Sequence, residues 1–187
     1  MASLQPKPDM KERILQTADR LFYLDGIRAV GVDTIAAAIG ISKRTLYNHF
    51  PSKDALISAY LERRFVYAKP SGKPPAEQIL ATFDSLERFF SAKDFRGCPF
   101  VNAVAELGPK DRAVKKIAVA FKESRRLWFR ARLEELGVAE ADALATQLQL
   151  LVDGSIALDL VRDDPTMARA AKEAARVLLR NAGVKVE

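Results

Sequence analysis

Apolar residues recur at intervals of three and four positions along most of the chain, which is the spacing of one face of an α-helix. Between residues 9 and 26, Ile14, Ala18 and Phe22 follow this spacing, Asp9 can cap the start and Gly26 can end the helix. The same pattern predicts longer helices at about residues 53–68, 75–92, 98–107, 110–136, 140–162 and 165–182. No strand-like alternation stands out, so we predict an all-α fold of about nine helices.

Two shorter helices joined by a tight turn are predicted between residues 32 and 50. Ile35 and Ile39 give the first of them one apolar face. Gly40 can end it, because a tight turn after a helix usually needs a residue that tolerates a left-handed backbone. Ser42 is a good N-cap for the second helix. This arrangement is typical of a helix-turn-helix that reads DNA.

The second short helix separates two kinds of side chain when it is placed at about 100° per residue. Leu46 and Phe50 fall together and are expected to face a small core. The opposite side suits base pairs in a major groove, because arginine pairs with guanine, asparagine with adenine, and a threonine methyl can touch thymine. The predicted base contacts are Arg44, Thr45 and Asn48. The predicted phosphate contacts are Ser42, Lys43, Tyr47 and His49, with Lys53 from the next helix.

Residues 10–67 resemble the DNA-binding domain of the TetR (tetracycline-repressor-like) family of transcriptional regulators. The resemblance rests on ILQTADRLFYLDGI, on DTIAAAIG and above all on the string SKRTLYNHFPSKDAL. One departure is Gly31, which has no side-chain oxygen where the family often has Thr or Ser. The resemblance implies an N-terminal three-helix helix-turn-helix DNA-binding domain and a C-terminal helical ligand-binding and dimerisation domain.

The segment KPSGKPP at residues 69–75 is the clearest break in the helical pattern, because proline and glycine both oppose helix continuation. We therefore predict a tail and helix-turn-helix domain at 1–52, a connecting helix at 53–68 and a helical ligand-binding and dimerisation domain at 69–187.

The last two predicted helices carry more apolar residues than a single small domain would cover. Two such helices from each of two chains would form a four-helix interface, and LVDGSIALDLVRDDP resembles the family's dimerisation region. A glycine inside the first of them costs about 1 kcal/mol relative to alanine, which a close approach of another backbone would explain. The predicted interface residues are Leu144, Leu148, Leu151, Val152, Gly154, Leu158, Ala171, Ala174, Val177 and Leu178. The alternative is that these helices are intrachain core.

Bulky side chains gather in the sequence between residue 65 and the last two helices. The family resemblance implies an inducer pocket for a small, mostly apolar ligand there, whereas the plain alternative is a packed core. Ligand sites combine an apolar lining with a few polar groups. The predicted lining is Phe65, Phe83, Phe90, Phe100, Asn102, Phe121, Trp128 and Gln147.

The composition narrows the remaining possibilities. A net charge of +6 suits an anionic partner. With a single histidine, His49, and a single cysteine, Cys98, we expect no metal site, no cofactor and no catalytic group. No signal segment or long apolar run is evident, so we expect a cytoplasmic protein without a membrane partner.

These observations predict a homodimeric transcriptional repressor with no enzymatic activity. It would bind palindromic double-stranded operator DNA and be released by a small-molecule inducer. Three alternatives remain open. The first is an architectural protein that binds DNA without sequence preference, and the second is a helical enzyme that binds a small molecule. The third is a regulator that senses oxidants through Cys98, whose pKa a helix N-terminus and Arg96 could lower.

Overall fold

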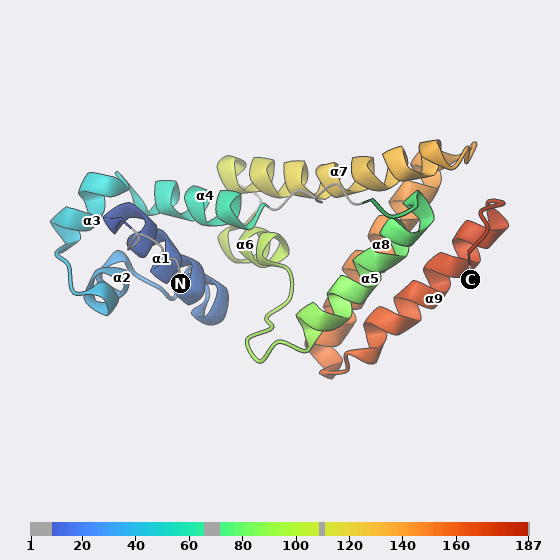
Figure 1. The fold of residues 1–187 in the computed structure, drawn as a ribbon. Coiled ribbons are helices and arrows are strands. Elements are labelled where there is room, and N and C mark those ends of the chain that lie inside the picture. Colours follow the sequence, from blue (N-terminus) through green and yellow to red (C-terminus); the bar gives the residue numbers. More distant parts are fainter. Residues whose placement is uncertain (1–8, 66–71, 109–110, 187) are drawn as a thin grey trace, which may run out of the picture. The chain divides into compact units, whose positions relative to one another are not determined.

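A computed structural model describes residues 9–65, 72–108 and 111–186, and within these ranges every regular element is a helix (Figure 1). The predicted all-α fold is therefore confirmed. The helices are α1 Met10–Asp25, α2 Val32–Ile39, α3 Lys43–His49, α4 Lys53–Arg64, α5 Pro75–Phe90, α6 Pro99–Leu107, α7 Arg112–Glu135, α8 Ala141–Arg162 and α9 Thr166–Asn181.

Helix ends follow local chemistry. The carboxylate of Asp9 accepts a hydrogen bond from the backbone N–H of Glu12 at 2.7 Å, which caps α1. Ser52 caps α4 in the same way by accepting from the Ala55 N–H at 3.0 Å. The prediction that this helix reaches residue 68 was wrong, because α4 ends at Arg64 and Phe65 leaves the helical conformation with ψ 82°. The predicted tail, residues 1–8, and most of the predicted linker lie outside the described residues.

Contacts divide the chain into two compact units that are not continuous in sequence. The first unit comprises the described residues of Met1–Phe65 and Pro99–Ala118. The second comprises those of Val66–Cys98 and Val119–Glu187. The described residues of 99–118 thus pack with the N-terminal helices, although the sequence places them beyond the predicted linker. The domain boundaries drawn from the sequence stay a prediction.

The first unit is built around α1, which packs against both α2 and α4 (Figure 1). Its centre consists of fully buried aliphatic side chains, including Ile14, Ile35, Leu46 and Leu56. The rings of Phe22 and Tyr60 meet edge to face, with centroids 5.6 Å apart. Burial raises the pKa of the Tyr60 hydroxyl well above its ordinary value.

Polar contacts hold α4 and α6 in this unit. The Arg64 guanidinium binds both carboxylate oxygens of Asp19, at 2.6 and 3.0 Å, and so ties α4 to α1. The Glu106 carboxylate of α6 accepts from the backbone N–H of Arg28 at 3.0 Å. Gly26 lies directly beside this carboxylate, and a Cβ there would come within 3.1 Å of it. The turn after α1 is therefore held between its own helix and α6.

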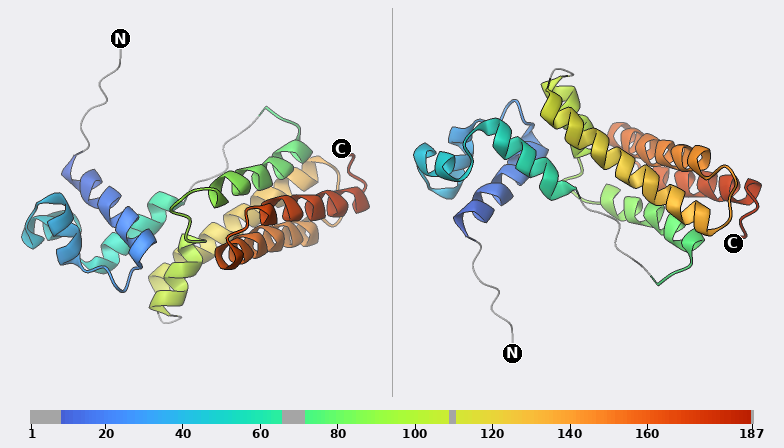
Figure 2. Two further views of the ribbon diagram at one scale, coloured as in Figure 1. Left: turned by 90° about the horizontal axis from the view of Figure 1, so that it is seen from below. Right: turned by 90° about the horizontal axis from the view of Figure 1, so that it is seen from above.

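The second unit is a helical bundle in which α5, α8 and α9 pack against one another (Figure 2). The later part of α7 joins them through ion pairs with α8. Lys122 pairs with Asp153 at 2.5 Å, and Asp142 pairs with Arg126 at 2.6 Å and with Arg130 at 3.6 Å. Lys172 of α9 pairs with Asp84 of α5 at 2.5 Å. These contacts set which faces of α8 and α9 remain exposed.

By length and composition, α8 is long and apolar enough to cross a membrane, and no other helix of the described residues is. A core helix of a soluble protein meets the same test. Nine residues of α8, from Ala141 to Asp159, are buried within this chain.

Candidate nucleic-acid interface

The turn between α2 and α3 is fixed by backbone geometry. Gly40 adopts the left-handed conformation, with φ 70°, at the end of α2. The backbone N–H of Ile41 then returns to the carbonyl of Ala36 at 3.0 Å, which closes the helix end. A residue with a side chain would be strained at this φ. The turn predicted from Gly40 is thus present and sets the direction in which α3 begins.

The start and inner face of α3 are fixed next. The Ser42 hydroxyl accepts from the Thr45 backbone N–H at 3.0 Å and caps the helix. Leu46 is fully buried and Phe50, which follows the helix, is 4% exposed. These two anchors hold one side of α3 against the core of the first unit. The opposite side of α3 must therefore face outwards.

Four polar or aromatic residues occupy that outer side. Arg44, Asn48 and His49 are exposed, and Tyr47 is 38% exposed. None of the four side chains forms a hydrogen bond or an ion pair with any other residue that the structure describes. Their donors and acceptors are therefore available to another molecule. A helix with such a face can enter the major groove of DNA.

Three other predicted contact residues have partners within the chain. The hydroxyls of Ser42 and Thr45 lie 2.9 Å apart and bond to each other, and Thr45 is half-buried. Lys43 pairs with Asp33 of α2 at 3.0 Å, and this hydrogen bond raises the pKa of Lys43. A phosphate contact from Lys43 would compete with Asp33, a residue that the sequence pattern does not single out.

Lys53 also has a partner that the sequence did not indicate. Its ammonium donates to the carbonyl of Ile27 at 2.6 Å and lies 5.9 Å from the centroid of the Phe22 ring. The side chain is half-buried. Lys53 therefore links the first turn of α4 to the loop after α1, and its predicted phosphate contact stays a prediction.

Two short helices at a left-handed turn, with a free polar face on the second, define a helix-turn-helix DNA-binding protein. Comparisons with known proteins agree. Residues 14–60 match the family described as "Bacterial regulatory proteins, tetR family", and residues 75–174 match "Transcriptional regulator LmrA/YxaF-like, C-terminal domain". The chain belongs to the TetR family of bacterial transcriptional regulators, as its sequence resemblance predicted.

Relatives cover nearly the whole chain. The HTH-type transcriptional regulator YxaF of Bacillus subtilis is 28% identical over 94% of this chain and 97% of its own length. A crystallised tetR-type transcriptional regulator of Streptomyces avermitilis is 31% identical, with a TM-score of 0.83 over 95% of this chain and 100% of its own. The TetR-family regulator SCO4454 of Streptomyces coelicolor is 30% identical, with a TM-score of 0.84 over 92% of this chain and 95% of its own.

The predicted ligand-pocket residues divide between the two units. Phe65, Phe100 and Asn102 belong to the first, where the rings of Phe65 and Phe100 meet edge to face at 6.3 Å. The other five belong to the second. Among these, Phe83, Phe90 and Phe121 are buried and Trp128 is half-buried. No single unit contains the whole predicted set.

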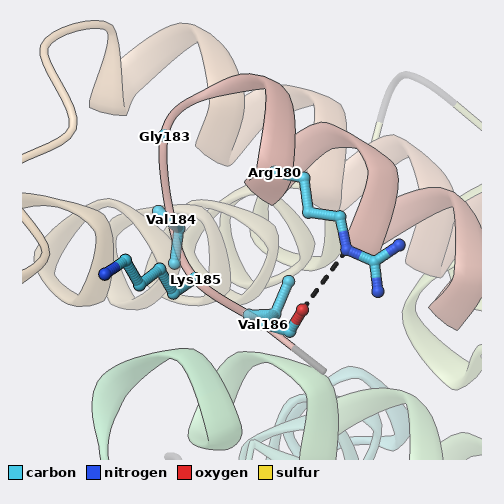
Figure 3. Close-up of a pocket in the computed structure, with 5 residues that line it drawn as sticks. All are labelled: Arg180, Gly183, Val184, Lys185 and Val186. Carbon is cyan, nitrogen blue, oxygen red and sulfur yellow. Dashed lines mark hydrogen bonds between the residues drawn. The ribbon is translucent and has the colours of Figure 1, made fainter.

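Gln147, the last of the predicted pocket residues, is exposed and lines a surface groove. This groove of about 390 Å³ lies between α8, the end of α9 and the loop before α8. A second hollow, of about 580 Å³, is lined only by Arg180 and residues 183–186 (Figure 3). There Arg180 donates to the carbonyl of Val186 at 3.3 Å. Neither hollow includes any of the predicted aromatic residues.

The predicted dimer residues divide into three groups by their exposure. Leu144, Leu148, Val152 and Ala171 are at most 7% exposed within one chain. They are buried within one chain, so they offer little surface to a second copy, and their place in a dimer interface stays a prediction. Leu151, Ala174 and Leu178 are less exposed than the remaining three, Gly154, Leu158 and Val177.

Two of the three exposed members, Gly154 and Leu158, belong to an apolar stripe along α8. We call Leu150, Gly154, Leu158 and Val161 the α8 stripe; its three larger members are 66%, 52% and 82% exposed. Val177 of α9 is 52% exposed as well. Leu150 and Val161 were absent from the predicted interface, although their spacing of four and three from the other two members indicates a common helix face.

Proposed function

We propose that this regulator is a repressor that binds a palindromic operator as a homodimer and is released by a small, mostly apolar ligand. The observation that carries the proposal is the outer face of α3, where Arg44 and Asn48 are exposed and free of hydrogen-bonded partners among the described residues. Its backbone is held by a capped start and two buried anchors. Direct base readout requires a helix that is held in place and whose side-chain hydrogen-bond donors are free to meet the bases.

Contacts to DNA divide between bases and phosphates. Arg44 and Asn48, with the methyl group of Thr45, are the proposed base contacts. Tyr47 and His49 flank them and are the proposed phosphate contacts from the same helix. Ser42, Lys43 and Lys53 remain proposed phosphate contacts, but each first gives up or shares a bond inside the protein.

The α8 stripe supports the homodimer. Leucine and valine side chains that are half or more exposed along one helix form a contiguous apolar surface, which in soluble proteins marks an interaction site. Gly154 lies within this stripe, and nothing lies within 4 Å of a Cβ built there. A second α8 can therefore approach closely at that point. A two-fold dimer presents two α3 helices, so the operator is a palindrome.

The second unit is the proposed ligand-binding part, because it matches the C-terminal domain of LmrA/YxaF-like regulators and buries Phe83, Phe90 and Phe121. We place the protein in the cytoplasm, where its DNA target is found. It acts by binding and not by catalysis.

Selection of tight-binding duplexes from random DNA tests the proposal. A palindromic consensus bound by a dimer supports it, and the electrophoretic mobility of the complex gives the stoichiometry. Recovery of sequences without a shared motif would instead favour the architectural DNA-binding alternative. Equal affinity for the selected and the scrambled duplex at physiological salt would favour that alternative too.

The redox alternative lacks a favourable observation. A thiol sensor must be open to its oxidant. Cys98 is only 7% exposed and has no cysteine partner in the chain.

A further inference from the structure

A charged cluster lies inside the second unit between α7 and α8. The carboxylate of Asp153 accepts from the Lys122 ammonium at 2.5 Å and from the Gln149 amide at 2.8 Å. Gln149 itself is 8% exposed. Lys122 and Asp153 thus neutralise each other, and Gln149 orients the carboxylate. This leaves no unpaired charge among these three residues.

Arg125 adds a positive charge to this cluster. Its guanidinium lies 4.9 Å from the centroid of the Phe121 ring. Its Nη1 atom is buried and has no hydrogen-bond partner within the described chain, and Arg125 forms no ion pair there. Burial lowers the pKa of Arg125, against the opposing influence of Asp153 and Cys98. Leaving such a group unpaired is costly, since a buried donor normally has a partner.

An unused acceptor accompanies this unused donor. The Oε1 atom of Gln149 is buried and likewise has no hydrogen-bond partner in the described part of the chain. The Nε2 side of the same amide is fixed by Asp153, so Oε1 cannot be satisfied by turning the amide over without losing that bond. The cluster therefore offers one cationic donor and one neutral acceptor, next to an aromatic ring.

We propose that Arg125 is the anion-binding group of the ligand site in the second unit, and that the effector is an aromatic acid. Its carboxylate or ionised phenol binds the Arg125 guanidinium, a hydroxyl of the ligand can donate to Gln149, and its apolar body lies against Phe121. The inference rests on the proposed function as a ligand-responsive regulator. It narrows the expected small, mostly apolar ligand to an amphipathic acid.

Paired probes test this directly on the full-length protein. The probes are benzoate, salicylate, cinnamate and 1-naphthoate, each compared with its neutral methyl ester by isothermal titration calorimetry and thermal shift. We expect at least one acid to bind about tenfold or more tightly than its ester, as a charge-assisted hydrogen bond requires. Arg125→Met should abolish that preference. Arg125→Gln serves the same purpose if the methionine variant does not fold, with circular dichroism as the check.

Arg130→Met is the matched control. Arg130 lies on the same helix, is 45% exposed and pairs with Glu134 at 2.8 Å and with Asp142 at 3.6 Å. Neither partner belongs to the proposed site, so the loss of Arg130 should leave the acid preference unchanged. The proposal is overturned if no acid binds more tightly than its ester, or if the preference survives in the folded Arg125 variants. Because these readouts involve no DNA, a wild-type protein that selects no operator would contradict the proposed function and leave the ligand site standing.

Discussion

The proposed dimer surface yields the sharpest prediction about association, because α8 offers two leucines that differ mainly in direction. Leu158 belongs to the α8 stripe and is 52% exposed, whereas Leu160 is 47% exposed. Two residues along a helix turn the side chain by about 200°. Leu160 therefore points towards the side of α8 that carries Gln149 and Asp153. This side faces α7, because Asp153 pairs with Lys122 there. We predict that Leu158→Glu dissociates the dimer and that Leu160→Glu does not.

The magnitude follows from the exposed fraction. Burying a whole leucine contributes about 2 kcal/mol, so covering the exposed half of Leu158 contributes about 1 kcal/mol in each subunit. A two-fold interface counts this twice, which gives about 2 kcal/mol and a dissociation constant raised about 30-fold. Desolvation of the two new carboxylates adds to this, so the estimate is a lower bound.

Sedimentation velocity over a range of protein concentrations measures the effect, and far-UV circular dichroism confirms that both variants remain helical. Equal dissociation constants for Leu158→Glu and Leu160→Glu would refute the assignment of the α8 stripe. A wild-type protein that stays monomeric at high concentration would do the same.

Three further predictions concern single side chains. Arg44→Ala should cost about 1 to 3 kcal/mol of operator affinity and relax the preference at one base pair, measured by fluorescence anisotropy on matched and substituted duplexes. Lys53→Ala should lower the free energy of unfolding by about 1 kcal/mol in urea titrations, because it removes the hydrogen bond to the Ile27 carbonyl; unchanged unfolding would contradict that role. Burial, together with the charges of Asp163 and Asp164, raises the pKa of Asp159. The ionised side chain therefore destabilises the fold above that raised pKa, and this destabilisation disappears as the pH falls to the ordinary pKa of aspartate. Asp159→Asn should therefore raise the melting temperature most near neutral pH, and a gain that is independent of pH would rule out this cause.

Much of the fold could be predicted because the signals that begin and end its helices are local. Asp9, Gly40 and Ser42 define helix ends through hydrogen bonds or backbone conformations that involve only near neighbours. The outer face of α3 follows from the same logic, since two buried anchors determine which side remains. Local patterns cannot show contacts between distant residues. Glu106 reaches Arg28 across 78 positions, and Lys53 reaches Ile27 across 26.

The faces of α8 could not be assigned from sequence for a different reason. This helix is apolar on nearly all sides, so its pattern does not distinguish the side that packs within the chain from the side that faces a second copy. Leu148 and Val152 proved to be fully buried, while Leu150 and Val161 remain exposed. Buried aromatic residues pose the same difficulty, because core packing and a ligand lining use the same side chains.

The most direct test of base reading by α3 compares the DNA motifs selected by the wild-type protein and by Asn48→Ala, with Arg88→Ala as the control. Arg88 lies on α5, is exposed and belongs to the second unit. If α3 reads base pairs, Asn48→Ala should lose sequence preference at one symmetric position of the palindrome and keep the rest, and Arg88→Ala should select the wild-type motif. An unchanged motif for Asn48→Ala, together with an unchanged motif for Arg44→Ala, would contradict the assignment of α3 as the reading helix.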